Sequence, residues 1–483
     1  MKKKRFMGFI LAGILSTSAM GGTAQGMNVN AEGNQPNYSD ATGRLVLDSW
    51  IGPLMTDEAY KEYADCGYNR VHFNNTSVHV EGGTSEADFR SLNAQLDTHF
   101  TLAEKYGIDV ILAMNARNTV QTSATPFEWV DGKLHDTLQK WKDSDTFYGY
   151  MPYDEPSFAL SLSAESPEML QRDYEKVTDY ILDEYIYFKH NYPGKKFETV
   201  MLRDANLGET MGYHNAGLDT YEKYLDYYYD NVMQYMPYED RICSMDAYAF
   251  GKKSEEYYIR ECWISSLEKN GYQAEKVNGE KWTYMMNHDY ITNVASVLYQ
   301  YYTAMAYGYT NFTTYCYRAA WGGTCSIDEL GQKTDNYYYY QAAHQEIKSF
   351  ENVYMQFVDN WKGALVCNGS NSKLAESDKP WCTATHLLSS YDRIKAFTAT
   401  QDALMGIMQD KNGYEGFMIT NQVTPQGNTE NQVSVTFNNA TKALVYINGQ
   451  NAQVVSLNGG KLDLTLKSGG GAFVIPIKEM ETV

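Results

Sequence analysis

The sequence predicts an α/β protein made of a (β/α)8 TIM barrel followed by a small all-β sandwich domain. Eight short apolar segments, each suited to a buried parallel strand, alternate with longer segments of helical period between about residues 43 and 361. The pattern then changes to short strands separated by hairpin turns. No glycine-rich phosphate-binding turn follows the first strand, and this disfavours an open doubly wound sheet.

The barrel elements alternate along the chain as strand and helix. Helix starts are expected at Thr56, at Ser166 before a helix that ends near His190, and at Asp289 before a helix over 290–306. Short polar side chains favour these positions because they accept a hydrogen bond from the first helical turn. The expected strands are 45–47, 70–73, 110–114, 147–151, 199–202, 242–245, 282–286 and 311–315.

The last part of the chain reads as a β-sandwich. Its segments alternate with turns such as Asn448-Gly449, which is typical of hairpins. The expected strands are 403–408, 416–420, 433–437, 443–447, 462–466 and 472–476. The predicted organisation is a signal peptide over 1–31, a flexible leader over 32–42, the barrel over 43–365, a linker over 366–384 and the sandwich over 385–483.

The N-terminus has the pattern of a secretory signal peptide. Four basic residues at 2–5 precede an apolar run over 6–20, and small residues at positions 29 and 31 precede Glu32. We expect cleavage near Ala31 and a secreted, extracellular bacterial protein. No later stretch approaches the length of apolar chain that crosses a bilayer, so no membrane span is expected.

Charge and composition narrow the classes of partner. The 483 residues include 60 acidic and 40 basic ones, for a net charge of −20. That charge repels phosphate backbones and argues against nucleic acid as a partner. Aromatic residues make up 14% of the chain, and we expect most of them to pack helices against strands while a minority stack on a ligand.

The cysteines and histidines do not predict a metal site or a cofactor. The seven cysteines are widely and irregularly spaced, with no Cys-x-x-Cys pair. Cys66, Cys243 and Cys316 are expected to pack in the core, and Cys367 with Cys382 could form a disulfide. No cofactor and no metal are therefore predicted, and the oligomeric state is left open.

Two carboxylates stand at the end of the fourth strand, where barrel enzymes carry their reactive groups. The strand leads into Asp154 and Glu155, with Pro156 directly after them. An acidic group there is costly to bury without a partner, although capping the next helix or facing solvent is an alternative role. The surrounding tyrosine and methionine side chains would raise the pKa of Glu155 and suit it to donate a proton.

Asp154-Glu155-Pro156 resembles the Asn-Glu-Pro motif of clan A glycoside hydrolases, a family that includes β-galactosidase-like enzymes. The resemblance implies that Glu155 is the general acid/base and that Asp154, in place of the asparagine, contacts a sugar hydroxyl. The resemblance covers the barrel. The C-terminal β domain is similar to the β domains that follow the barrel in many β-galactosidase-like enzymes.

One feature departs from that family. Its members carry a nucleophilic glutamate at the end of strand seven, whereas residues 285–289 here read Met-Met-Asn-His-Asp. The preferred second carboxylate is Asp246, at the end of strand six, and Asp289 is the alternative. Asp246 could equally be a salt-bridge partner of an arginine. Because the separation of the two carboxylates decides between inversion and retention, the stereochemistry is left open.

Polar and aromatic residues at the other strand ends suit a sugar, which offers hydroxyls at its rim and C–H faces for stacking. Trp321 also resembles the tryptophan on which clan A enzymes rest the reacting sugar. The predicted substrate-binding residues are Asp154, Trp50, His72, Asn115, Arg203, Tyr248, Asn287, Tyr317 and Trp321.

The leading hypothesis is therefore a secreted glycoside hydrolase that cleaves O-glycosidic bonds of oligo- or polysaccharides, with Glu155 and Asp246 as its catalytic carboxylates. The alternative is a non-catalytic carbohydrate-binding protein on a degenerate barrel, which the missing strand-seven glutamate favours. The sugar, its linkage and the choice between exo and endo action are left open.

Overall fold

The structure is a computed structural model, and it describes most of the chain after residue 35. The described residues are 36–74, 86–113, 127–154, 167–201, 221–247, 250–253, 256–259, 261–271, 276, 281–285, 291–318, 325–372, 387–423 and 425–478. The predicted signal peptide and residues 32–35 of the predicted leader lie outside these residues, whereas residues 36–42 of the leader are described.

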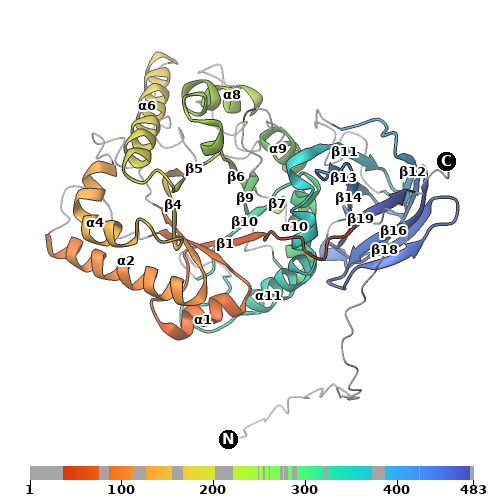
Figure 1. Cartoon of the computed structure of the whole chain (residues 1–483), viewed down its shortest axis with the longest axis horizontal. Coiled ribbons are helices and arrows are strands. Elements are labelled where there is room, and N and C mark those ends of the chain that lie inside the picture. Colours follow the sequence, from red (N-terminus) through yellow and green to blue (C-terminus); the bar gives the residue numbers. More distant parts are fainter. Residues whose placement is uncertain are drawn as a thin grey trace, which may run out of the picture. The chain divides into compact units, whose positions relative to one another are not determined.

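Eight parallel strands form the barrel that the sequence predicted (Figure 1). They are β1 (Val46–Trp50), β2 (Arg70–Asn74), β3 (Asp109–Ala113), β4 (Phe147–Asp154), β5 (Lys196–Val200), β6 (Cys243–Ala247), β9 (Lys281–Met285) and β10 (Asn311–Tyr315). Their order is β5-β4-β3-β2-β1-β10-β9-β6, and a parallel bridge between Met201 and Met245 joins the two ends. At this bridge the amide of Met201 donates to the Ser244 carbonyl at 2.9 Å, and the amide of Asp246 donates to the Met201 carbonyl at 2.8 Å. The barrel is therefore closed between β5 and β6.

The helices of the barrel follow the strands. They are α1 (Asp57–Asp65), α2 (Glu86–Tyr106), α4 (Phe127–Trp141), α6 (Pro167–Asn191), α8 (Tyr221–Asn231), α9 (Glu261–Gly271), α10 (Val294–Ala306), α11 (Asp335–Lys348) and α12 (Glu351–Tyr354). Thr56 caps α1, as predicted, by accepting from the Ala59 amide. The expected helix start at Asp289 is wrong, because α10 begins at Val294 and Asn293 caps it by accepting from the Ser296 amide at 2.9 Å.

The C-terminal part forms two antiparallel sheets. Their strands are β11 (Trp361–Cys367), β12 (Ile394–Ala399), β13 (Ala403–Gln409), β14 (Glu415–Asn421), β15 (Asn431–Phe437), β16 (Ala440–Ile447), β17 (Gln453–Ser456), β18 (Lys461–Leu466) and β19 (Gly471–Lys478). One sheet has the order β11-β13-β14-β19-β16-β17 and the other β12-β15-β18. Apolar side chains from both sheets, including Met405 and Val435, pack in one buried cluster. This is the predicted sandwich, and all six predicted strands are present.

The sandwich contains strand β11, although the predicted boundary between the barrel and the linker, after residue 365, falls within this strand. Residues 361–367 pair with β13, so the sandwich begins earlier than predicted. Ala364, Leu365 and Cys367 are buried, whereas the polar composition that suggested a linker belongs to the residues after this strand. The sequence of β11 combines polar and apolar residues without regular alternation, so it does not by itself indicate a strand. Its partner β13 lies about 40 residues away in the chain.

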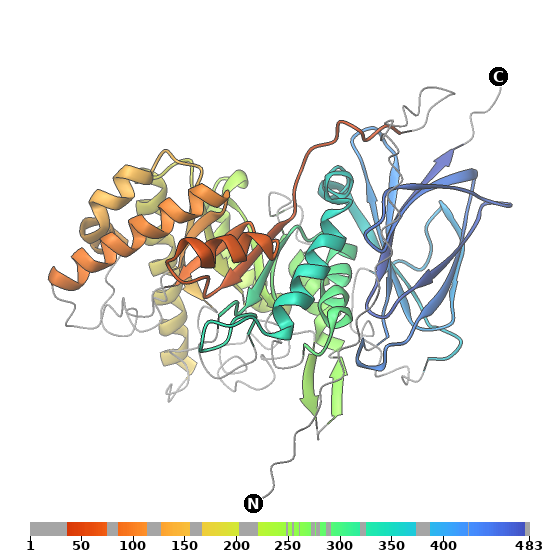
Figure 2. The ribbon, with the colours of Figure 1, turned by 90° about the horizontal axis from the view of Figure 1, so that it is seen from below.

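A two-stranded antiparallel hairpin that the sequence did not predict follows β6. It consists of β7 (Phe250–Lys253) and β8 (Glu256–Ile259), with Phe250 opposite Ile259. Figure 2 shows it projecting away from the barrel strands. Since β6 ends at Ala247, the hairpin belongs to the connection that leaves the carboxyl end of the barrel.

The helix α10 connects the core of the barrel to the sandwich. Every residue over 296–306 is buried, and the helix packs on β13 and β14. Tyr299 donates to the side-chain oxygen of Gln422 at 2.9 Å, and the amide nitrogen of Gln422 donates to Thr303 at 2.9 Å. Much of the tyrosine content thus packs helices, as predicted, and one buried cluster extends from the barrel into the sandwich.

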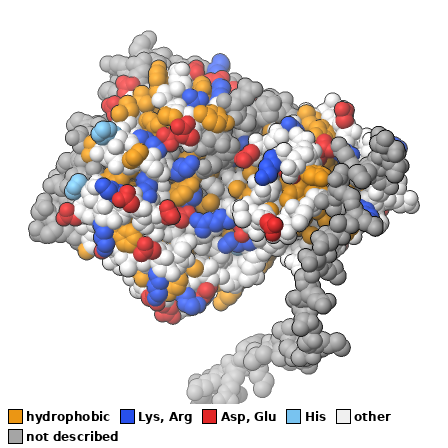
Figure 3. All heavy atoms as spheres, viewed as in Figure 1, with side chains coloured by type: hydrophobic (Ala, Val, Ile, Leu, Met, Phe, Trp, Pro, Cys, Tyr) orange, Lys and Arg blue, Asp and Glu red, His pale blue; other side chains and the backbone are white. Residues whose placement is uncertain are grey.

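The surface charge and the hydrophobicity of the helices both bear on possible partners. On the face shown in Figure 3, acidic and basic side chains are intermixed. Within the described part of the chain, no helix combines the length and the apolar character needed to cross a membrane.

Candidate active site

Asp246 lies at the carboxyl end of β6, on the strand face that looks into the barrel. Ser244, two residues earlier, donates a hydrogen bond to Glu198 on β5 at 2.7 Å, so it faces the interior. Because side chains alternate along a strand, Asp246 shares this face one step nearer the carboxyl end. Its exposed fraction is 2%, so the carboxylate is held inside the barrel and not in solvent.

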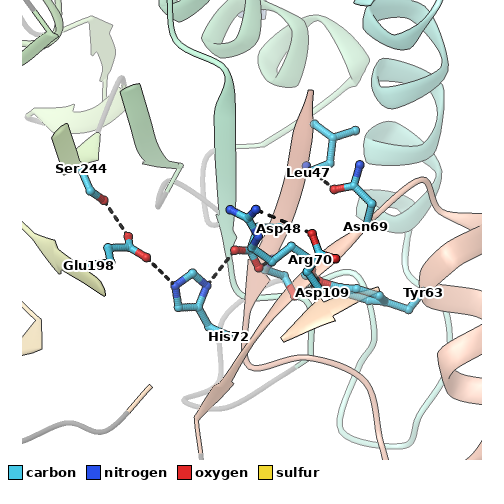
Figure 4. Close-up of polar contacts among 10 residues, drawn as sticks. Leu47, Asp48, Tyr63, Asn69, Arg70, His72, Asp109, Glu198 and Ser244 are labelled. Atoms are coloured by element: carbon cyan, nitrogen blue, oxygen red, sulfur yellow. Dashed lines mark hydrogen bonds and ion pairs between the residues drawn. The ribbon is translucent and has the colours of Figure 1, made fainter. Parts of the chain in front are cut away.

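A chain of buried polar groups crosses the barrel interior (Figure 4). His72 on β2 lies between two carboxylates: its Nδ1 is 2.8 Å from Asp48 on β1, and its Nε2 is 3.3 Å from Glu198. The second oxygen of Glu198 accepts from Ser244. Four strands are therefore connected by polar side chains that are each no more than 2% exposed.

The surroundings of His72 favour its charged form. Burial alone lowers the pKa of this imidazole, but the neighbouring carboxylates of Asp48 and Glu198 outweigh burial and raise the pKa to about 9. At neutral pH, His72 is thus an imidazolium held between two carboxylates. Such a group keeps a fixed charge and a fixed orientation beneath the carboxyl end of β6.

The opposite end of the interior is filled by Arg70, the first residue of β2. Its guanidinium lies 3.7 Å from the ring centre of Tyr148 and 4.9 Å from that of Trp282. Its Nη2 is also 3.7 Å from a carboxylate oxygen of Asp109. The stacked rings and the paired charge of Arg70 thus fill the barrel interior at the amino ends of the strands. A binding or catalytic site is therefore expected at the carboxyl ends of the strands.

Trp50 joins the polar chain to an apolar cluster. Its ring centre is 5.6 Å from that of His72, with the planes tilted by 36°. The cluster that contains Trp50 draws on several strands and includes Ile111, Ala113, Met151, Val200, Trp282, Cys316 and Cys325. Apolar groups around a few convergent polar ones are typical of small-molecule sites.

The structure brings together three of the predicted residues: Trp50, His72 and Asp246 all belong to the barrel interior. Tyr317 does not join them. Its ring packs against Tyr63 of α1 at 4.7 Å and against Tyr68 at 5.5 Å, within the core between strands and helices. It is 2% exposed, so the structure places this side chain in helix packing and not beside the other candidates.

The remaining candidates fall on parts of the chain that the structure does not describe. Asp154 is the last residue of β4, and its backbone is in register with Val200, but nothing is described of its side chain. The residues outside the described ranges are Glu155, Asn115, Arg203, Tyr248, Asn287, Trp321 and the alternative carboxylate Asp289.

Sequence reasoning missed Glu198 and Ser244 as partners of the site. The expected fifth strand began at residue 199, whereas β5 spans Lys196–Val200 and includes Glu198. A signal was present, because a carboxylate between Phe197 and Thr199 in an otherwise buried strand needs a partner. Within the described ranges, no group of three or more histidine, cysteine or acidic residues is placed to hold a metal ion.

Comparison with known proteins finds similar folds among solved structures. No known protein family and no curated protein matches the sequence. A solved structure of a catalytic mutant of a GH42 β-galactosidase from G. stearothermophilus is similar over 90% of this chain and 98% of its own, with a TM-score of 0.51 and 9% identity. A GH30 endoxylanase from Clostridium papyrosolvens C71 matches over 90% and 97% of the two chains, with a TM-score of 0.41 and 10% identity.

These neighbours are glycoside hydrolases. The β-galactosidase likeness concerns the fold, since its identity is far too low to carry an activity across. The class of fold is therefore a (β/α)8 barrel with a C-terminal β domain, as the sequence predicted.

Proposed function

We propose that this protein is a secreted glycoside hydrolase that cleaves O-glycosidic bonds of oligo- or polysaccharides, with Glu155 and Asp246 as its catalytic carboxylates. The observation that supports this best is the position of Asp246, buried on the interior face at the carboxyl end of β6. The strand β4 ends at Asp154, and Glu155 is the next residue in the chain. Carboxyl ends of barrel strands are where such enzymes carry their reactive groups.

The two carboxylates have different roles in this proposal. Glu155 donates a proton to the glycosidic oxygen, and Asp246 acts as the base or nucleophile on the other side of the sugar. Both β4 and β6 neighbour β5, which puts their backbones about 10 Å apart. That separation is compatible with side chains converging on one glycosidic bond from two sides.

The same proposal gives the other candidates binding roles. Trp50 supplies an aromatic face next to the polar chain, which suits the C–H face of a sugar ring. The polar contacts to hydroxyls would come from Asp154, Asn115, Arg203, Tyr248 and Asn287, with Trp321 as a second stacking platform. Export would expose the site to polysaccharides outside the cell.

The test is turnover by the mature chain that begins at Glu32, assayed on aryl glycosides and polysaccharides. We expect Glu155→Gln and Asp246→Asn each to lower the turnover number at least about 100-fold, because each removes a proton-transfer or charged group while keeping the shape of the side chain. The exposed residues Glu104 and Asp136 provide matched controls, since Glu104→Gln and Asp136→Asn should leave turnover unchanged.

Undiminished turnover in either site variant would remove that residue from the proposal. A second candidate function, carbohydrate binding without cleavage, is favoured by the residues after β9, where 286–289 contain no glutamate. Thermal stabilisation by a glycan, with no product formed by the wild-type chain, would support binding alone.

A further inference from the structure

Two cysteines from different segments of the chain meet at the carboxyl end of β10. Cys316 follows the last residue of β10, and Cys325 begins the next described segment. Both belong to the apolar cluster inside the barrel, and each is 3% exposed. The Cys325 side chain interacts with the Cys316 thiol and helps to raise its pKa, so the two side chains are neighbours in this cluster.

The backbone keeps these segments in register. Arg318 and Ile327 form a parallel bridge, and the amide of Ile327 donates to the Tyr317 carbonyl at 2.9 Å. The two bridged residues are nine positions apart, which is also the spacing of Cys316 and Cys325. Neighbouring strands lie about 4.8 Å apart, within the range of Cα separations that a disulfide spans.

We propose that Cys316 and Cys325 form a structural disulfide in the mature protein. Both cysteines carry free thiols in this structure. In the proposed step both S–H bonds break and one Sγ–Sγ bond forms, while two electrons and two protons pass to a disulfide oxidant, which is reduced to two thiols. The oxidant is a small-molecule or protein disulfide of an oxidising compartment, consistent with the proposed export.

Burial determines when this bond can form. Removal from water raises the pKa of the Cys316 thiol, so the folded chain contains little of the reactive thiolate. The bond therefore forms while the chain folds, before the barrel interior closes around the pair. The same burial protects the finished bond from reductants.

The bond would fix the end of β10 beside β1. The amides of Tyr317 and Arg318 donate to the carbonyls of Trp50 and Ile51, both at 3.2 Å. A disulfide at Cys316 closes a ring of ten residues next to these contacts, and the ring contains Trp321. It thereby restricts the chain on both sides of that tryptophan.

Peptide mapping of the wild-type chain tests the pairing directly. The protein is unfolded and refolded with reduced and oxidised glutathione, free thiols are blocked with iodoacetamide in denaturant, and trypsin is added without reductant. Trypsin cuts after Lys281, Arg318 and Lys333, so the two cysteines fall on separate peptides, 282–318 and 319–333, with no other cysteine in either. We expect one linked species, two hydrogen masses below the sum of both peptides, that separates on reduction.

Controls and a second measurement complete the experiment. Cys325→Ser should abolish the linked species, whereas Cys243→Ser, which replaces another buried thiol, should preserve it. Recovery of both peptides separately with alkylated cysteines would overturn the pairing, whether or not the chain is exported or hydrolyses glycans. We also expect the oxidised wild type to melt about 3 °C above the reduced one, because the bond restricts the unfolded chain. Equal melting temperatures would overturn the inferred restriction at β10.

Discussion

His72→Gln is expected to lower the free energy of unfolding by at least about 3 kcal/mol at pH 7, because it removes the cationic group that lies between two buried carboxylates. Asp48 and Glu198 would then face each other across the barrel without the imidazolium. Glutamine can donate to one of them but cannot carry the charge that both require.

The pH dependence distinguishes this role from simple packing. The pKa of His72 is raised from its ordinary value of 6.5 to about 9, so its protonated form is favoured by folding. A raised histidine pKa contributes stability that is fully present below pH 6.5 and is lost as the pH rises through 9. Over this window, the contribution amounts to about 3 kcal/mol.

Urea unfolding at pH 6, 7.5 and 9 checks this prediction. We expect the wild-type free energy of unfolding to fall across the series, and the fall to be much smaller in His72→Gln. His135→Gln, at an exposed histidine, is the matched control and should keep the wild-type slope. An equal slope in His72→Gln and the wild type would show that His72 is not charged in the folded state.

Gly406→Ala is expected to destabilise the protein by about 3 kcal/mol or more through the contact between the barrel and the sandwich. Gly406 lies on β13 against the end of α10, and a Cβ there would stand 1.9 Å from the carbonyl oxygen of Ala306. A backbone atom of a buried helix cannot move aside as a side-chain tip can. The strand and the helix would have to separate, with loss of packing on both sides.

This variant also tests whether barrel and sandwich unfold together. One buried cluster contains residues of both and joins tyrosines of α10 to Phe473 of β19. We therefore expect one unfolding transition by tryptophan fluorescence and by circular dichroism, shifted to lower urea in Gly406→Ala. Gly194→Ala is the control, since nothing lies within 4 Å of its added Cβ. Two separate transitions, with only one of them shifted, would contradict the shared cluster.

Several features of this protein could be read from the sequence by itself. The eight barrel strands, six of the nine described sandwich strands and the Thr56 cap were predictable because their signals are local: apolar runs, turn residues and short polar caps. Asp246 could be named as a candidate because it directly follows the apolar segment 242–245, which marks the end of a strand.

Only the tertiary structure decided which side chains meet. His72 and Glu198 are 126 residues apart in the chain, and their contact depends on the closure of the barrel between β5 and β6. The contact between Cys316 and Cys325, the packing of Tyr317 on α1 and the pairing of β11 with β13 likewise depend on backbone registers that no local pattern contains. The sequence determines where polar groups stand along each strand, whereas the register between strands decides which of them become partners.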